Sequence, residues 1–143
     1  MPISSSVLRL DAEALNHFLG KAFPHANEER RGRVRSVEPG LLIAEMKPND
    51  RALRPGGLIS GPTQMGFADM AAYVMLLAHI GPVAMAVTSG LNYQFLRPCL
   101  PGVLTAKAEL LRLGKKLAVM DVRLYSGDDP RPVGQATVTY AIP

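Results

Sequence analysis

The second half of the chain alternates between hydrophobic and polar residues with a period of two. Such alternation predicts half-buried β-strands, because successive side chains of a strand point to opposite faces of a sheet. Residues 103–113 and 116–125 follow this pattern, and the apolar faces of the two expected strands carry Leu104, Ala106, Ala108 and Leu110, and Ala118, Met120, Val122 and Leu124.

Four further segments have strand-like patterns. Residues 32–37 and 41–47 flank the turn Glu38-Pro39-Gly40, and residues 133–142 are rich in Val and Thr. Residues 84–96 are expected to form a strand that places one set of side chains opposite another, namely Val87, Leu91, Tyr93 and Phe95 opposite Thr88, Asn92 and Gln94.

Two segments have helical spacing. Residues 11–23 predict a short amphipathic helix with acidic residues in its first turn, and Pro24 ends it. Residues 62–80 predict a long helix with Pro62 as its first residue and Gly81-Pro82 after its end. This long segment is apolar on nearly every side, which is typical of a helix that is buried all round.

These elements predict one α+β domain over residues 1–143, in which a meander of antiparallel strands curves around the long central helix. Residues 49–57 are expected to be a loop, since they contain Asn, Asp, Pro and a Gly-Gly pair. Part of the long helix is also expected to be covered by a second copy of the chain.

Composition narrows the function classes. The chain has 143 residues, a net charge of +4 and one cysteine, which is typical of a globular domain without disulfides. No targeting segment is visible, and the charge-poor stretch 70–96 is broken by Gly81-Pro82, so we expect a cytoplasmic protein that does not enter a membrane. Cys99 and the three histidines have no ligand-like spacing, and no metal site is expected.

Asp69 lies in the middle of the long apolar helix. It is either a surface-facing helix acid or a carboxylate in a cleft, where it could act as a general base or nucleophile. The flanking residues leave no obvious polar face, which favours the second interpretation.

A glycine-rich segment, residues 54–62, leads into the same helix. The N–H of Gly61 is a candidate donor to a carbonyl oxygen or oxyanion, because helix N-termini have unpaired N–H groups and a favourable dipole; an ordinary turn is the alternative. Gly61 and Asp69 are separated by about 12 Å of helix, so one chain can hardly bring both to one carbonyl. A two-fold dimer with antiparallel helices would place Asp69 of one chain beside Gly61 of the other.

The run 56–71 resembles the signature segment of hotdog-fold acyl-CoA thioesterases, and most closely the phenylacetic-acid-degradation type, which is related to hydroxybenzoyl-CoA thioesterases. Those proteins carry His-Gly-Gly followed, seven residues after the last glycine, by an Ala-Asp pair. The resemblance continues through segments 91–98, 101–102, 112–116 and 136–140, and covers about residues 32–142. It implies a hotdog fold, active sites at a dimer interface, Asp69 as general base or nucleophile, and Gly61 N–H as the carbonyl-binding group.

Three residues depart from the family pattern. Ser60 stands where the family often has His, Arg54 where Asn or Gln often positions substrate or water, and Tyr73 where some relatives have Thr. We expect all three to lie at the substrate, where they would influence how water is positioned and which acyl group fits.

The resemblance also suggests how coenzyme A is held. Cationic side chains that could contact its phosphates are Arg97, Arg112, Lys115 and Lys116. Small polar residues that could line the path of its pantetheine arm are Thr88, Ser89, Gly90 and Asn92. Coenzyme A would be part of the substrate, so no separate cofactor is expected. Scattered basic residues with few aromatics argue against a nucleic-acid partner.

The function predicted is therefore hydrolysis of acyl-CoA thioesters by a homodimer or a dimer of dimers. Two alternatives stay open. One is a non-hydrolytic enzyme such as an enoyl-thioester hydratase, for which His79 is the nearby candidate histidine. The other is a module that binds acyl-CoA without turning it over.

Overall fold

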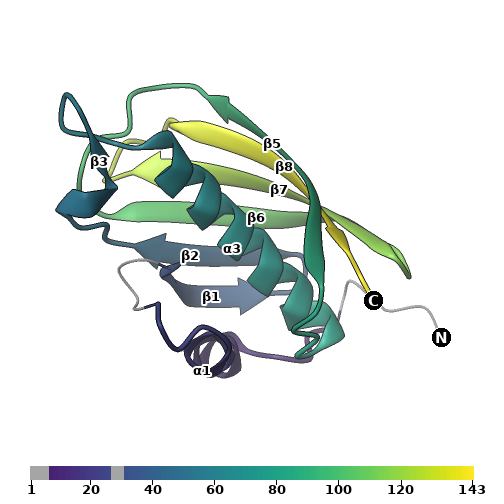
Figure 1. Cartoon of the computed structure of the whole chain (residues 1–143). Coiled ribbons are helices and arrows are strands. Elements are labelled where there is room, and N and C mark those ends of the chain that lie inside the picture. Colours follow the sequence, from purple (N-terminus) through teal and green to yellow (C-terminus); the bar gives the residue numbers. More distant parts are fainter. Residues whose placement is uncertain (1–6, 27–30) are drawn as a thin grey trace.

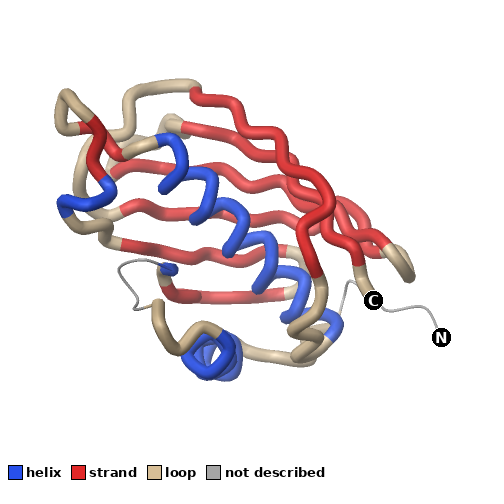
Figure 2. The backbone as a smooth tube through the Cα atoms, in the orientation of Figure 1, coloured by secondary structure: helices blue, strands red, loops and turns tan. Residues whose placement is uncertain are grey.

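A long helix, α3 (Gly61–Ile80), crosses one face of a curved antiparallel sheet of six strands in the computed structural model (Figure 1). The structure describes residues 7–26 and 31–143. A second helix, α1 (Ala12–Ala22), lies beside the sheet edge formed by β1, and Figure 2 shows both helices on the same side of the sheet. The predicted α+β hotdog architecture, a long helix wrapped by an antiparallel sheet, is confirmed.

The sheet contains the six strands that the alternation predicts, in the spatial order β1-β2-β6-β7-β8-β5. Their bounds are Arg33–Glu38 (β1), Leu41–Met46 (β2), Val87–Phe95 (β5), Leu104–Leu113 (β6), Leu117–Ser126 (β7) and Gly134–Ala141 (β8). The expected simple meander is wrong, because β5 lies at the far edge and pairs with β8, while β2 pairs with β6. Helix α3 carries the chain from β2 to the opposite edge, and β6–β8 then fill the space between.

On β6 and β7, the strand faces that pack on α3 are those the apolar pattern indicates. Ala118, Met120, Val122 and Leu124 of β7 are all fully buried. The expectation that α3 is buried all round holds only for its second half, since every residue from Ala71 to Ile80 is buried. In the first half, Pro62, Met65 and Gly66 are exposed. This open side of α3 is where a ligand or a second chain can reach the helix.

Helix α3 begins one residue earlier than expected. Ser60 is its N-cap and accepts a hydrogen bond from the backbone N–H of Thr63 at 3.3 Å, so Gly61 is the first helical residue and Pro62 the second. The helix ends at Ile80, and the capping residue Gly81 has a φ of 92°, which suits a residue without a side chain.

The segment expected to be a loop, residues 49–57, is more ordered than predicted. It contains a short 3₁₀ helix, η1 (Asp50–Ala52), and the first strand of a small hairpin formed by β3 (Leu53–Arg54) and β4 (Leu58–Ile59). Backbone hydrogen bonds from Ile59 N–H to Cys99 and from Ser60 N–H to Ala52 hold this hairpin in place. They fix the position at which α3 begins.

Helix α1 is fixed to both the sheet and α3. Asp11 caps it, Leu15 and Leu19 are fully buried, and the Asn16 side chain exchanges two hydrogen bonds with the backbone of Val34 in β1. Within the described ranges 7–26 and 31–143, neither helix is both long and apolar enough to cross a membrane.

Candidate active site

Asp69 is a half-buried carboxylate in the third turn of α3, at the edge of its open side. The hydroxyl of Thr88 donates to its Oδ1 at 2.7 Å, and the hydroxyl of Tyr140 donates to the same Oδ1 at 2.8 Å. The Tyr140 oxygen also lies 3.3 Å from the backbone carbonyl oxygen of Asp69. Asp69 is thus a carboxylate in a cleft, held by the sheet, and the interpretation as a free surface acid is excluded.

The two hydroxyls come from a cross-strand pair. Thr88 of β5 and Tyr140 of β8 are directly opposite in the antiparallel register, so their side chains project from the same face of the sheet. Thr88 was expected on the face opposite to Leu91, and this expectation is wrong. A β-bulge at Ser89 inserts one residue between the pairs Thr88–Tyr140 and Gly90–Thr139. Because of this extra residue, the alternation of side chains between the two faces shifts by one position at the bulge. Thr88 and Leu91 therefore both face α3.

A cavity of about 860 Å³ opens beside Asp69. It runs along α3 between α1, the segment preceding β5 and the end of β8, and its apolar wall includes Leu19, Phe23, Met46, Phe67, Met70, Tyr73, Ala84 and Ala86. Gly66 of α3 also lines this cavity, and a Cβ atom at this position would meet nothing within 4 Å. Two cations, Arg31 and Arg51, also line the cavity. We refer to this space as the Asp69 cavity.

Tyr73 lies in the Asp69 cavity, one turn of α3 after the carboxylate. Its ring stacks on Tyr140 at 5.7 Å between centroids and meets Phe23 edge-on at 6.2 Å. Its hydroxyl donates to the carbonyl oxygen of Ala84 at 3.0 Å, and burial raises its pKa above the ordinary value. Tyr73 therefore forms part of the aromatic wall, with its hydroxyl turned to the backbone.

Gly61 lines a second cavity of about 480 Å³, together with Arg54, Gln64, Phe95 and Arg97. We refer to this second cavity as the Gly61 hollow. As the first residue of α3, Gly61 has an N–H with no acceptor inside the helix. A Cβ atom at this position would lie 3.2 Å from the ring of Phe95, so a larger residue would need that ring to move. Within one chain, Gly61 and Asp69 line separate cavities.

The structure places the other small polar candidates as follows. Ser60 caps α3, and its hydroxyl lies 2.8 Å from that of Thr63. The Ser89 hydroxyl donates to the Thr139 carbonyl oxygen at 3.3 Å. Gly90 and Asn92 are exposed on β5, where Asn92 accepts from the Gln94 side chain. Of the four residues expected along the pantetheine arm, only Thr88 lines the Asp69 cavity.

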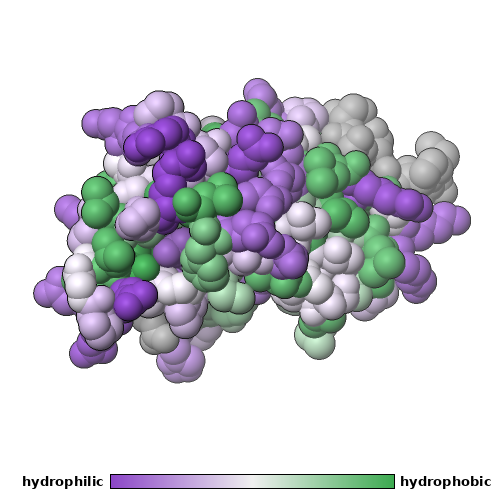
Figure 3. All heavy atoms as spheres, turned by 90° about the horizontal axis from the view of Figure 1, so that it is seen from above, coloured by the Kyte–Doolittle hydropathy of each residue, from purple (hydrophilic) through white to green (hydrophobic). Residues whose placement is uncertain are grey.

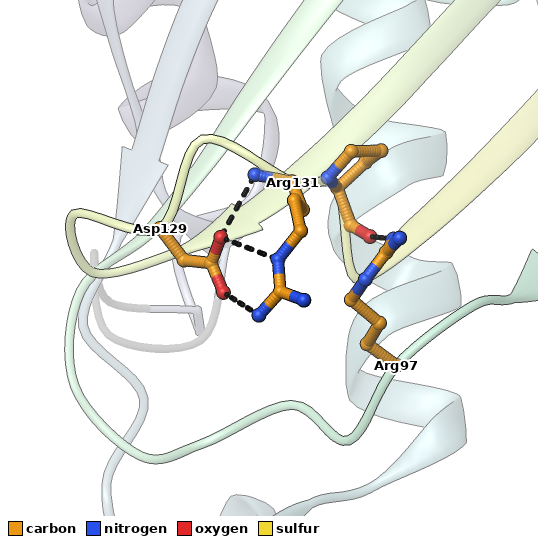
Figure 4. A network of polar contacts seen from close by, with 4 residues as sticks. Arg97, Asp129 and Arg131 are labelled. Carbon is orange, nitrogen blue, oxygen red and sulfur yellow. Dashed lines mark hydrogen bonds and ion pairs between the residues drawn. The ribbon is translucent and has the colours of Figure 1, made fainter.

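The candidate phosphate-binding cations lie at two ends of the sheet. Arg97 is near the start of β8, where its guanidinium donates to the carbonyl oxygen of Pro132 at 2.8 Å (Figure 4). Nearby, three hydrogen bonds from Arg131 hold Asp129 and lower the pKa of this carboxyl to about 2. Arg112, Lys115 and Lys116 belong to the β6–β7 hairpin, at the end where β5 begins. The four cations therefore do not form one cluster in a single chain.

His79, the histidine considered for a hydratase, belongs to the core. It is 1% exposed, and its Nε2 accepts the backbone N–H of Gly40 at 3.1 Å. Because Nε2 accepts, the proton of the neutral ring lies on Nδ1, which donates to the Met75 carbonyl oxygen at 2.9 Å. Both nitrogens are used, and His79 lines neither the Asp69 cavity nor the Gly61 hollow.

Tyr140 is the site residue that sequence reasoning missed. It lies 71 positions after Asp69, and its sequence signal is its place in segment 136–140, which shares the family resemblance but does not indicate a contact with Asp69. Cys99 is buried, which raises the pKa of its thiol to about 11 and makes it a poor nucleophile. Among residues 7–26 and 31–143, no three His, Cys, Asp or Glu side chains come together as they would around a metal ion.

The sequence pattern that defines the thioesterase superfamily matches residues 56–133, which is more than half of the chain. This matched region contains α3 with Gly61 and Asp69, and β5 with Thr88.

Several proteins resemble the whole chain or most of it. A solved thioesterase candidate from Silicibacter sp. TM1040 is 35% identical, with a TM-score of 0.88 over 98% of this chain and 96% of that one. A solved thioesterase candidate from Ralstonia eutropha JMP134, described as related to phenylacetic acid degradation, is 26% identical, with a TM-score of 0.74 over 89% of this chain and 100% of that one. A candidate esterase from Thermoplasma acidophilum is 24% identical over 66% of this chain and 71% of its own length.

Proposed function

Because the chain belongs to the thioesterase superfamily and is a thioester hydrolase, we propose that it hydrolyses acyl-CoA thioesters, with Asp69 as base or nucleophile and Gly61 N–H as oxyanion donor. The observation that carries this proposal is the Asp69 carboxylate, which two hydroxyls hold at the wall of a cavity of about 860 Å³. That volume lies within the usual range of small-molecule sites, roughly 300–1,000 Å³.

The chemistry can follow two balanced routes. As a general base, Asp69 takes a proton from water while the water oxygen bonds to the thioester carbon. The carbonyl oxygen becomes negative and accepts from Gly61 N–H, where the start of α3 also favours negative charge. The C–S bond then breaks, and the coenzyme A thiolate takes the proton. As a nucleophile, the carboxylate itself bonds to the carbon, the thiolate leaves, and water hydrolyses the resulting anhydride.

The acyl group is best placed in the Asp69 cavity. Its aromatic and aliphatic wall, with Phe23, Met70 and Tyr73, favours an apolar acyl chain or ring over a short polar one. Methionine side chains adapt to different shapes, so Met46 and Met70 are compatible with several acyl groups. Coenzyme A enters as part of the substrate, and its phosphates are the proposed partners of Arg97 and of the cations on the β6–β7 hairpin.

A second copy of the chain would complete the site. Gly61 and Asp69 of one chain line separate cavities, so a two-fold partner is needed to bring a Gly61 N–H to the Asp69 of the first chain. Among the strands of residues 7–26 and 31–143, β5 is an edge strand with one side free of sheet partners, which favours pairing with another chain.

The surface around β5 supports this pairing. Met65 of α3 is 38% exposed, and Val87 and Phe95 of β5 are 54% and 55% exposed. Seen from above, the molecule carries clusters of hydrophobic side chains between hydrophilic ones (Figure 3). A homodimer through this side, or a pair of such dimers, would cover apolar surface and the open side of α3.

Thiol release from a panel of short, medium, long and aromatic acyl-CoAs tests the proposal. The wild type should release thiol fastest from apolar acyl groups of medium or larger size. Asp69→Asn keeps the shape of the side chain and removes its charge, and kcat should fall at least 100-fold, because the base or nucleophile is lost. Cys99 adds no background, since its thiol is buried and has a raised pKa of about 11.

Asp121→Asn is the matched control, because Asp121 lies on β7 and lines neither cavity. Its turnover should stay within twofold of the wild type. Unchanged turnover in Asp69→Asn would overturn the role of Asp69. Tight acyl-CoA binding by the wild type without thiol release would instead identify a binding module.

A further inference from the structure

Both hydroxyls that reach Asp69 converge on one of its two oxygens. Thr88 Oγ1 and Tyr140 Oη donate to Oδ1 at 2.7 and 2.8 Å. A carboxylate has about four acceptor positions, two on each oxygen, so the positions of Oδ1 are filled. Both of the hydrogen bonds observed from side chains to the Asp69 carboxylate in the described part of the chain go to Oδ1. The two oxygens of Asp69 therefore have different surroundings.

We propose that Thr88 and Tyr140 are positioning residues, which together hold Oδ1 of Asp69 and leave Oδ2 as the oxygen that acts on the thioester or its water. This inference rests on the proposed function and assigns a division of roles within the carboxylate. It applies equally to the general-base and the nucleophilic route, since either one needs a single, correctly aimed oxygen.

A carboxylate at the exposed edge of a helix needs such support. The terminal torsion of an aspartate is broad, so the group can rotate unless its oxygens are held. Thr88 lies on β5 and Tyr140 lies on β8, and these two strands are hydrogen-bonded to each other along their length. The two donors are therefore fixed relative to each other, and together they fix the plane of the carboxylate on α3.

The surroundings keep Tyr140 a donor. Its side chain is 3% exposed, and its ring stacks on Tyr73 at 5.7 Å. Burial, followed by the nearby Asp69 charge, raises the pKa of Tyr140 above the ordinary value, so the phenol keeps its proton in the working pH range. Thr88 is more exposed, and the bulge at Ser89 is what turns it toward α3.

The test is a double-mutant cycle with Tyr140→Phe and Thr88→Val. Each single variant should lower kcat by roughly threefold, because one donor still holds Oδ1. The double variant should lower kcat by about 100-fold, which is the scale of hydrogen bonds to a charged group. KM should change less than threefold in all three, since neither hydroxyl is proposed to bind the substrate. Thr88→Ser keeps a hydroxyl and should retain turnover close to that of the wild type.

The chain offers a matched control pair. Tyr125 and Thr105 are also directly opposite each other, on β7 and β6, but on the face of the sheet away from the core. Tyr125→Phe with Thr105→Val should leave kcat within twofold. Unfolding midpoints of all variants, measured by circular dichroism, separate a loss of turnover from a loss of folded protein. Thr88 is exposed, so the comparison of Thr88→Ser with Thr88→Val is informative even where Tyr140→Phe folds poorly.

Two outcomes would overturn the inference. One is a folded double variant that retains more than a third of wild-type kcat. The other is a change confined to KM. Asp69→Asn, assayed in parallel, distinguishes this failure from failure of the proposed function. If Asp69→Asn is inactive and the double variant is active, only the positioning role is wrong. If Asp69→Asn is as active as the wild type, the proposed role of Asp69 is wrong, and the positioning role falls with it.

Discussion

At the scale of single residues, the site depends on a carboxylate whose donors come from another part of the chain. Asp69 lies on α3, and both hydroxyls that hold it lie on strands beyond that helix. The ring of Tyr140 stacks on that of Tyr73, so the hydroxyl that holds Asp69 belongs to a side chain packed against the cavity wall. Changes to any of these side chains are therefore expected to alter turnover more than the stability of the sheet.

His79 represents the opposite case, a polar side chain that supports folding. Replacing His79 with Ala removes the acceptor for Gly40 N–H and leaves a cavity in the core. The free energy of unfolding should fall by about 2–4 kcal/mol, as for other buried groups that lose both packing and a hydrogen bond. Urea unfolding measures this change, and thiol release gives kcat per folded chain, which should stay within twofold of the wild type. A stable variant that no longer releases thiol would instead show that turnover needs His79.

Sequence alone could nominate Asp69 and Gly61 as candidates, because both belong to one continuous segment. It could not identify Tyr140 as a partner of Asp69, since that contact depends on strand register 71 positions away. It placed Thr88 on the wrong face, because a period-two pattern does not reveal a bulge such as the one at Ser89.

At the scale of elements, α3 combines a buried half with an open half, and Gly66 lies in the open half. Glycine inside a helix costs about 0.5–1 kcal/mol relative to alanine. A Cβ at Gly66 would meet nothing within 4 Å, so packing within the chain does not require glycine there. Gly66 lines the Asp69 cavity, so the missing side chain leaves open space there, which the proposed acyl group would use.

Two substitutions separate these effects. Gly66→Ala should raise the free energy of unfolding by about 0.5–1 kcal/mol, measured by urea unfolding. Gly66→Leu should lower kcat/KM for bulky acyl groups at least tenfold without lowering stability, because the leucine side chain would fill part of the Asp69 cavity. Full activity of a folded Gly66→Leu variant would show that the substrate does not pass this part of α3.

The strands and helices themselves could be predicted, since their patterns are local. Strand order could not, because alternation tells which residues face the core and not which strand is the neighbour. The segment 49–57 was expected to be a loop for a similar reason. Its hairpin is stabilised by backbone hydrogen bonds to Cys99 and Ala52, which no side-chain pattern reports.

At the scale of the whole molecule, each proposed active site needs two chains. The Asp69 cavity supplies the carboxylate and an apolar wall, and the Gly61 hollow supplies a backbone donor with Arg54 and Arg97 nearby. The net charge of +4 is compatible with a phosphorylated coenzyme, although the candidate cations lie at both ends of the sheet. In the proposed dimer, the Asp69 cavity of one chain would face the Gly61 hollow of the other chain.

Subunit complementation tests this central claim most directly. Asp69→Asn removes the carboxylate from one chain, and Gly61→Pro removes the N–H from the other. Gly61→Ala serves as the control, since it adds a Cβ near Phe95 and keeps the N–H. Circular dichroism and size-exclusion chromatography establish that each variant is folded and of the same size as the wild type.

The measurement is thiol release by purified heterodimers that carry one chain of each variant, isolated with two different tags. Each parent homodimer should be nearly inactive. The heterodimer should recover about half of the wild-type activity, because one of its two sites combines an intact Asp69 with an intact Gly61. A heterodimer as inactive as its parents would contradict the account, since it would mean that Asp69 and Gly61 act within a single chain.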